Sequence, residues 1–369
     1  MRRSVIAASL LLTSSLPVLA QNLDTLRDGL DHLPAVILMQ DHGDLGYFID
    51  AGLMTELGKA DFRAMSRLMF GPIKQITEQT VDNDSAWWSK TGTTPDKLRY
   101  FAGFGRSPAV VTLWGLTDAA AADDMMATLG TFGFENAGAP GVIGNGEPMK
   151  MDPQKRDATD PWRTMIGAAQ FAAVKGSAVV QAQNPQSAML VAAEQPSLGE
   201  NPTMKTALAG IEQSAGDRAV LQAMVISPLF GMSGLDPAAF LSPTGDLEET
   251  QEKIEQQMED LQAGIPPYLG GIVADFEGDG QGIGIALTYP DCEIAQAAAD
   301  TLSARWVEMA GAEAQGEIVA ETAEGIDGLC ATAFTVSLEN DNPVQNPAYR
   351  AVTESYMRNE VGVLQIGQS

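Results

Sequence analysis

The chain has 369 residues, and its 48 acidic side chains against 22 basic ones give a formal net charge of −26. Because this charge repels phosphate groups, we expect neither nucleic acid nor an anionic lipid surface as a partner. Two cysteines are too few for a metal cage built of cysteines, and we expect no cofactor.

The first twenty residues have the pattern of an export signal. Arg2 and Arg3 precede the apolar run Val5–Leu12, and Val18-Leu19-Ala20 offers small residues for cleavage before Gln21. We therefore predict that residues 1–20 are a signal peptide and that the mature protein is soluble and periplasmic or secreted. No later stretch has the roughly 18 apolar residues that a membrane helix needs, so we expect no membrane insertion.

Apolar spacing and turn residues assign the segments that follow, in chain order. Ala35–Gln40 is expected to be a buried strand, and Asp61–Thr80 a helix that Gly71-Pro72 kinks or splits. Further strands are expected at Leu98–Phe104, Ala168–Lys175, Ser177–Ala182 and Ala219–Ile226, and a helix at Thr203–Gln213 after the cap Asn201.

One pattern occurs twice. Val110–Gly138 and Gly282–Gly311 each read as an apolar strand, a polar break that ends in an aspartate, and a helix. The aspartates, Asp118 and Asp291, are of the type that caps a helix by accepting a hydrogen bond from its free amides. A second echo pairs Asn201-Pro202 with Asn346-Pro347, each at a helix start. Since the echoes keep the same order, we predict an internal duplication.

The second half is expected to follow the order of the first. It contains a helix at Leu247–Leu261, hairpins at Gly270–Phe276 with Gly282–Leu287 and at Glu317–Glu321 with Leu329–Leu338, and a closing strand at Val363-Leu364-Gln365. Hairpins imply antiparallel pairing with helices on the sheet, so the predicted fold class is α+β. We assign residues 21–215 to the first repeat and 216–369 to the second, which form either two lobes or one shared sheet.

The segment from Phe101 to Val111 contains Gly-Phe-Gly followed by a strand. In this respect the first half of the mature chain resembles uncharacterised secreted bacterial proteins of unknown function. The resemblance carries no catalytic motif and implies no site residue.

Known catalytic motifs are missing from the chain. His32 and His42 are the only histidines, and neither accompanies a Gly-x-Ser-x-Gly nucleophile elbow. His42, between Asp41 and Asp44, fits a solvated turn better than a metal site. Paired carboxylates remain as a possible catalytic device, although 48 acidic residues make some close pair inevitable.

Two local motifs are candidates for binding. Asp275, Glu277 and Asp279, followed by Gly280, copy the opening of a calcium loop, although the twelfth position is Ala286 and a hairpin turn explains the same residues. Trp87 and Trp88 are adjacent aromatics in a polar loop. Because neighbours in an irregular segment face opposite ways, we expect one ring in the core and the other at a partner-binding surface.

The duplication also predicts a disulfide between Cys292 and Cys330. Aligning the repeats places these cysteines opposite Ala119 and Ala178, at a helix start and on a hairpin strand. Small residues at both places indicate a close approach of helix and strand, within the distance that a disulfide requires. An exported protein meets the oxidising conditions in which the bond forms.

Together these observations favour an exported, non-catalytic protein that binds an unknown periplasmic protein or small ligand. One alternative is a periplasmic hydrolase that uses acidic residues. The other is a structural binding protein that calcium assists at Asp275, Glu277 and Asp279.

Overall fold

The structure is a computed structural model that describes residues 20–39, 45–69, 71, 87–105, 109–157, 159–163, 166–232, 264–339, 344–358 and 360–367. Its centre is a twelve-stranded sheet in the order β11-β12-β10-β9-β8-β1-β2-β3-β7-β6-β5-β4, in which neighbours pair antiparallel. The strands are β1 (Gly46–Asp50), β2 (Leu98–Phe104), β3 (Val111–Leu116), β4 (Glu135–Asn136), β5 (Ile143–Gly144), β6 (Phe171–Lys175), β7 (Ala178–Ala182), β8 (Ala219–Ile226), β9 (Gly270–Glu277), β10 (Gln281–Tyr289), β11 (Glu317–Glu324) and β12 (Cys330–Leu338).

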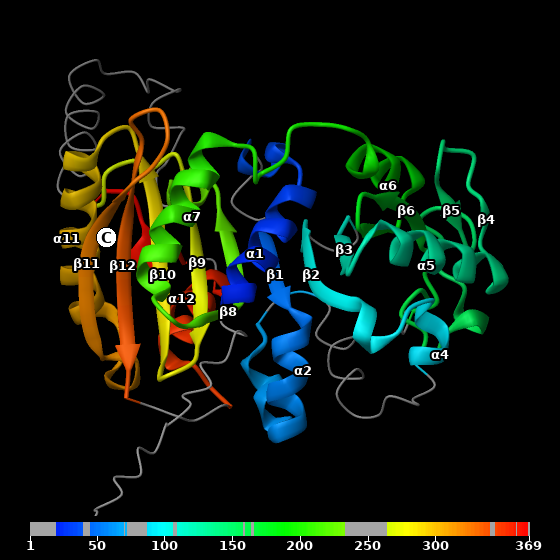
Figure 1. Ribbon diagram of the computed structural model, residues 1–369, viewed down its shortest axis with the longest axis horizontal. Coiled ribbons are helices and arrows are strands. Elements are labelled where there is room, and N and C mark those ends of the chain that lie inside the picture. The colour runs from blue at the N-terminus through cyan, green and yellow to red at the C-terminus, as the bar shows by residue number, and fades with distance from the viewer. Residues whose placement is uncertain are drawn as a thin grey trace, which may run out of the picture.

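Helices lie on both faces of this sheet, which confirms the α+β class (Figure 1). They are α1 (Ala20–His32), α2 (Ala51–Ala60), α4 (Trp88–Thr91), α5 (Ala119–Thr131), α6 (Pro185–Ala192), α7 (Pro202–Ala215), α8 (Pro228–Gly231), α11 (Cys292–Met309) and α12 (Pro347–Met357). Short 3-10 segments are η1 (Ala35–Met39), η2 (Phe62–Arg67), η3 (Pro95–Lys97), η4 (Pro153–Lys155), η5 (Ala312–Ala314) and η6 (Gly362–Leu364).

The strand order is symmetric about its centre, as an internal duplication would require. Outward from the central β1–β8 pair, one side runs β2, β3, β7, β6 and the other runs β9, β10, β12, β11. Five strands on each side therefore hold mirrored places, and β1 pairs antiparallel with β8 at the centre, whereas β5 and β4, at the edge beyond β6, have no counterpart among the described strands. The two units share one continuous sheet instead of forming two separate lobes, and the predicted division at residues 215 and 216 falls in the loop between α7 and β8.

The repeated strand-to-helix stretch has the predicted local structure in both units. Asp118 accepts a hydrogen bond from the backbone N–H of Ala121 at 2.8 Å and begins α5. Asp291 accepts one from Ile294 at 2.9 Å and begins α11. In each case the aspartate side chain stops the strand and satisfies an amide that the first helical turn leaves free.

The helices divide the core into three apolar clusters. On one face, α1, α6 and α7 cover a cluster that extends across both units. On the opposite face, α2 and α5 cover the first unit, whereas α11 and α12 cover the second. The helix α1 packs on β1, β2 and β8 and so lies over the junction between the units, and α7 lies beside it on β9, β10 and β12 (Figure 1).

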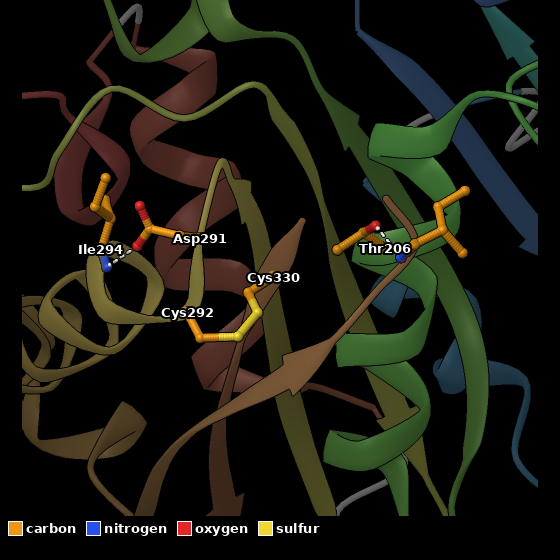
Figure 2. Close-up of a disulfide and its surroundings, with 6 residues drawn as sticks. Thr206, Asp291, Cys292, Ile294 and Cys330 are labelled. Carbon is orange, nitrogen blue, oxygen red and sulfur yellow. Dashed lines mark hydrogen bonds between the residues drawn. A yellow bond between two sulfur atoms is a disulfide. The ribbon is translucent and has the colours of Figure 1, made fainter. Parts of the chain in front are cut away.

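Cys292 and Cys330 form the predicted disulfide, with 4.9 Å between their α-carbons. It joins the first residue of α11 to the first residue of β12 (Figure 2). The first residues of the equivalent elements, α5 and β7, are Ala119 and Ala178. The cysteines therefore occupy equivalent small-residue positions, as the alignment of the repeats predicts.

Three secondary-structure predictions are wrong. The run expected to be a strand at Ala35–Gln40 is the 3-10 helix η1, in which the backbone N–H of Ile37 donates to the carbonyl of Pro34 and Met39 is 76% exposed. Of the helix expected at Asp61–Thr80, the described residues form only the 3-10 helix η2, which ends at the cap Leu68; residues 70 and 72–80 lie outside the described ranges. The expected closing strand is the 3-10 segment η6.

Several expectations concern residues that the structure does not describe. The signal peptide is one of them, since only its last residue, Ala20, is described; the turn around His42 and the helix expected at Leu247–Leu261 also lie outside the described ranges. Among the helices that are described, none combines the length and the apolar character required to cross a membrane.

Candidate functional site

Trp87 and Trp88 are both core residues, with exposed fractions of 1% and 6%. Their rings meet edge to face with centroids 4.8 Å apart, and Trp87 also stacks on Trp114 at 6.0 Å. The expectation that one ring faces a partner is therefore wrong. Trp88 is the first residue of α4, where consecutive side chains are only about 100° apart and two neighbours can both point inward.

Asp275 and Glu277 lie on the same face of β9, but both face Arg67. The guanidinium of Arg67 donates to Asp275 at 3.0 Å from Nε and 2.5 Å from Nη2, and Nη1 donates to Glu277. Asp279 lies in the turn between β9 and β10. An arginine thus occupies the space between two of the three carboxylates that the calcium hypothesis requires.

Two amides complete the surroundings of Asp275, whose side chain is fully buried. Gln222 donates to it at 2.9 Å, and Asn346 donates to it at 2.7 Å. Burial disfavours the charge on Arg67, but the carboxylates of Asp275 and Glu277 outweigh this effect and raise the pKa of Arg67. Asn346 also caps α12, so the network ties η2 and α12 to the centre of the sheet. Its role is structural.

A cavity of about 790 Å³ lies between α1, α7, the turn after β6 and the segment 192–200. On the α7 side its inner wall contains Met204 and Leu208, which are four residues apart and therefore share one side of the helix. Leu30 of α1 faces the same space. All three side chains are buried, so this part of the cavity wall is apolar.

Charged side chains line the rest of the cavity. Arg27 of α1 is paired with Asp24 on its own helix and with Glu212 of α7, so its charge is already balanced. Asp31 and Glu200 lie at the exposed rim. Partial burial raises the pKa of Asp31, and the nearby charge of Glu200 contributes in the same direction.

Lys175 also lines the cavity. It is the last residue of β6, and its Nζ is buried without a hydrogen-bond partner among the residues that the structure describes. Burial lowers the pKa of Lys175, because a desolvated ammonium is unfavourable. An acceptor supplied from outside the chain would satisfy this group.

Two smaller cavities, of about 450 and 420 Å³, lie elsewhere on the first unit. Within the described residues, no group of three or more histidine, cysteine, aspartate or glutamate side chains is arranged to hold a metal ion. The cavity between α1 and α7 is therefore the candidate functional site. Comparison of the chain with known protein families, with characterised proteins and with solved structures finds no match.

Proposed function

We propose that this protein is an exported binding protein that holds a small ligand in the cavity between α1 and α7. The observation that carries the proposal is the cavity itself. Its volume of about 790 Å³ lies within the range of roughly 300 to 1,000 Å³ that is typical of small-molecule sites. An apolar stretch of wall beside convergent polar groups is also found in such sites.

The position of the cavity supports the same function. Its two helical walls are both held against the sheet, α1 over β1, β2 and β8 and α7 over β9, β10 and β12. Arg27 of α1 and Glu212 of α7 connect these walls across the cavity. A site on packed helices is more rigid than one on loops, so the ligand meets a largely formed pocket.

Native mass spectrometry of protein purified without denaturation tests the proposal. Ala209 lines the cavity on α7, and Ala209→Trp should fill part of it. We expect the wild-type protein to carry, or to acquire from a low-molecular-weight periplasmic extract, a non-covalent adduct that Ala209→Trp lacks. Ala297→Trp, on the exposed side of α11, is the matched control and should retain the adduct. Identical spectra for wild type and Ala209→Trp would contradict the proposal.

The alternative, a hydrolase that uses acidic residues, has one candidate pair in the same cavity. Asp31 and Glu200 influence each other electrostatically, and the raised pKa of Asp31 favours a group that can donate a proton. Asp31→Asn distinguishes the two functions. A binding protein retains its adduct unchanged in this variant, whereas a hydrolase accumulates uncleaved substrate in it.

A further inference from the structure

The inner surface of the cavity selects for an apolar ligand body. Leu30, Met204 and Leu208 present buried hydrocarbon groups to the space, and the half-buried Ala209 adds a fourth. Contact between these groups and water is unfavourable, so binding of a ligand that replaces this water with hydrocarbon is favoured. This surface alone does not distinguish a neutral ligand from a charged one.

Lys175 provides that distinction. Its ammonium has three hydrogen-bond donors, and its buried Nζ donates to none of the described groups. A buried cation without an acceptor is costly, and an anionic oxygen is its strongest partner. Lys205, the basic side chain of α7, is exposed to water at the rim, and Arg27 of α1 is engaged by two carboxylates.

The basic side chains that are available in the cavity limit the charge of the ligand's anionic group. A single lysine is a point charge, whereas phosphate sites usually use an arginine fork or several cations. The exposed carboxylates of Asp31, Glu194 and Glu200 at the rim would repel additional negative charge. The site therefore matches a ligand that has one compact anionic head, placed next to Lys175, and an otherwise uncharged body.

We infer that the cavity binds an amphipathic monoanion, such as a carboxylate with an apolar body, whose head accepts hydrogen bonds from Lys175. This inference rests on the proposed binding function and names the class of its ligand. The apolar body would lie along Leu30, Met204 and Leu208, and the head at the end of β6.

Three probes with the same chain length test the inference: decanoate, decanol and decyltrimethylammonium. Their affinities are measured by isothermal titration with wild type, Lys175→Met, Lys175→Arg and the control Lys59→Met, which removes an exposed lysine from α2 on the opposite face. We expect decanoate to bind wild type best. Lys175→Met should weaken decanoate by about tenfold or more, in line with the loss of a charge-assisted hydrogen bond. Lys175→Arg and Lys59→Met should stay within about threefold of wild type.

A measurement without ligand checks that Lys175 is held for binding and not for folding. Because Lys175→Met removes an unpaired buried charge, its thermal midpoint should equal or exceed that of wild type. A clearly lower midpoint would overturn the inference, since it would show that Lys175 stabilises the ligand-free fold.

The other outcomes separate the inference from the proposed function. If decanol or the cationic probe binds as well as decanoate, and Ala209→Trp abolishes that binding, the cavity binds ligands but the anionic class is wrong. If none of the probes binds, the inference is wrong, and the adduct seen by native mass spectrometry decides the proposed function independently.

Discussion

Removing Arg67 should strongly destabilise the fold, because it leaves a buried carboxylate without its cation. The side chains of Arg67 and Asp275 are 1% and 0% exposed, and the pair is joined by two hydrogen bonds. Breaking a buried ion pair by removing one partner typically costs about 3 to 5 kcal/mol. We therefore expect Arg67→Met to lower the free energy of unfolding by this amount.

Asp275→Leu should lower the free energy of unfolding at least as much, because it leaves Arg67 without this carboxylate and the amide donors of Gln222 and Asn346 without this acceptor. The double variant Arg67→Met/Asp275→Leu removes both charges, so its loss should be smaller than the sum of the single losses by roughly 1 to 3 kcal/mol.

Urea denaturation followed by tryptophan fluorescence measures these free energies. Arg350→Met is the control, because it removes an arginine from an exposed pair with Glu354 and should cost less than about 1 kcal/mol. Additive losses in the double variant, or a cost for Arg67→Met no larger than that of the control, would refute the assigned role of the network.

Four further predictions concern single features. Replacing Cys292 and Cys330 by alanine should lower the free energy of unfolding by about 4 kcal/mol on the chain-entropy model for their separation of 38 residues, and the denatured, unreduced wild type should show no thiols in a titration. Burial raises the pKa of Asp50 from 3.8 to about 6, so its contribution to stability is complete only below the unfolded pKa of 3.8 and is lost as the pH rises through 6. Asp50→Asn should therefore gain about 2 kcal/mol relative to wild type between pH 4 and pH 7 in urea titrations, and no change in this difference would show that Asp50 is not the titrating group. Millimolar calcium should leave the thermal midpoints of wild type and Asp279→Asn equal to those in chelator, because Arg67 occupies the neighbouring carboxylates; a shift confined to wild type would restore the calcium hypothesis. Trp87→Ala should cost about 3 to 5 kcal/mol as a cavity mutation, whereas a neutral effect would place the ring outside the core.

Local signals in the sequence predict the repeated parts of the fold well. Asp118 and Asp291 each follow an apolar strand and precede a helical pattern, and a cap of this kind acts within three residues. The alignment of the repeats then locates the disulfide, because helix start and strand start recur in both units. The prediction of a strand at Ala35–Gln40 is wrong because such a local signal is missing there: a short apolar run has no periodicity that distinguishes a strand from a 3-10 turn.

The candidate site could not be predicted in this way. Its walls come from four segments, α1, the turn after β6, residues 192–200 and α7, which only the folded sheet brings together. Lys175 has the sequence context of an ordinary charged residue beside a hairpin turn, and no local signal marks its Nζ as buried. Arg67 gives a weak signal, as a single cation among the apolar residues around Met65 and Leu68, but its partner on β9 is about two hundred residues away.

The most direct test of the central claim is thiol footprinting of the cavity. Since the two native cysteines are bonded to each other, Ala209→Cys introduces a single free thiol into the cavity and Ala297→Cys introduces one on the far face. A small-molecule periplasmic extract should slow the labelling of Ala209→Cys severalfold and leave the labelling of Ala297→Cys unchanged. Equal labelling rates for Ala209→Cys with and without the extract would contradict the claim that this cavity is the binding site.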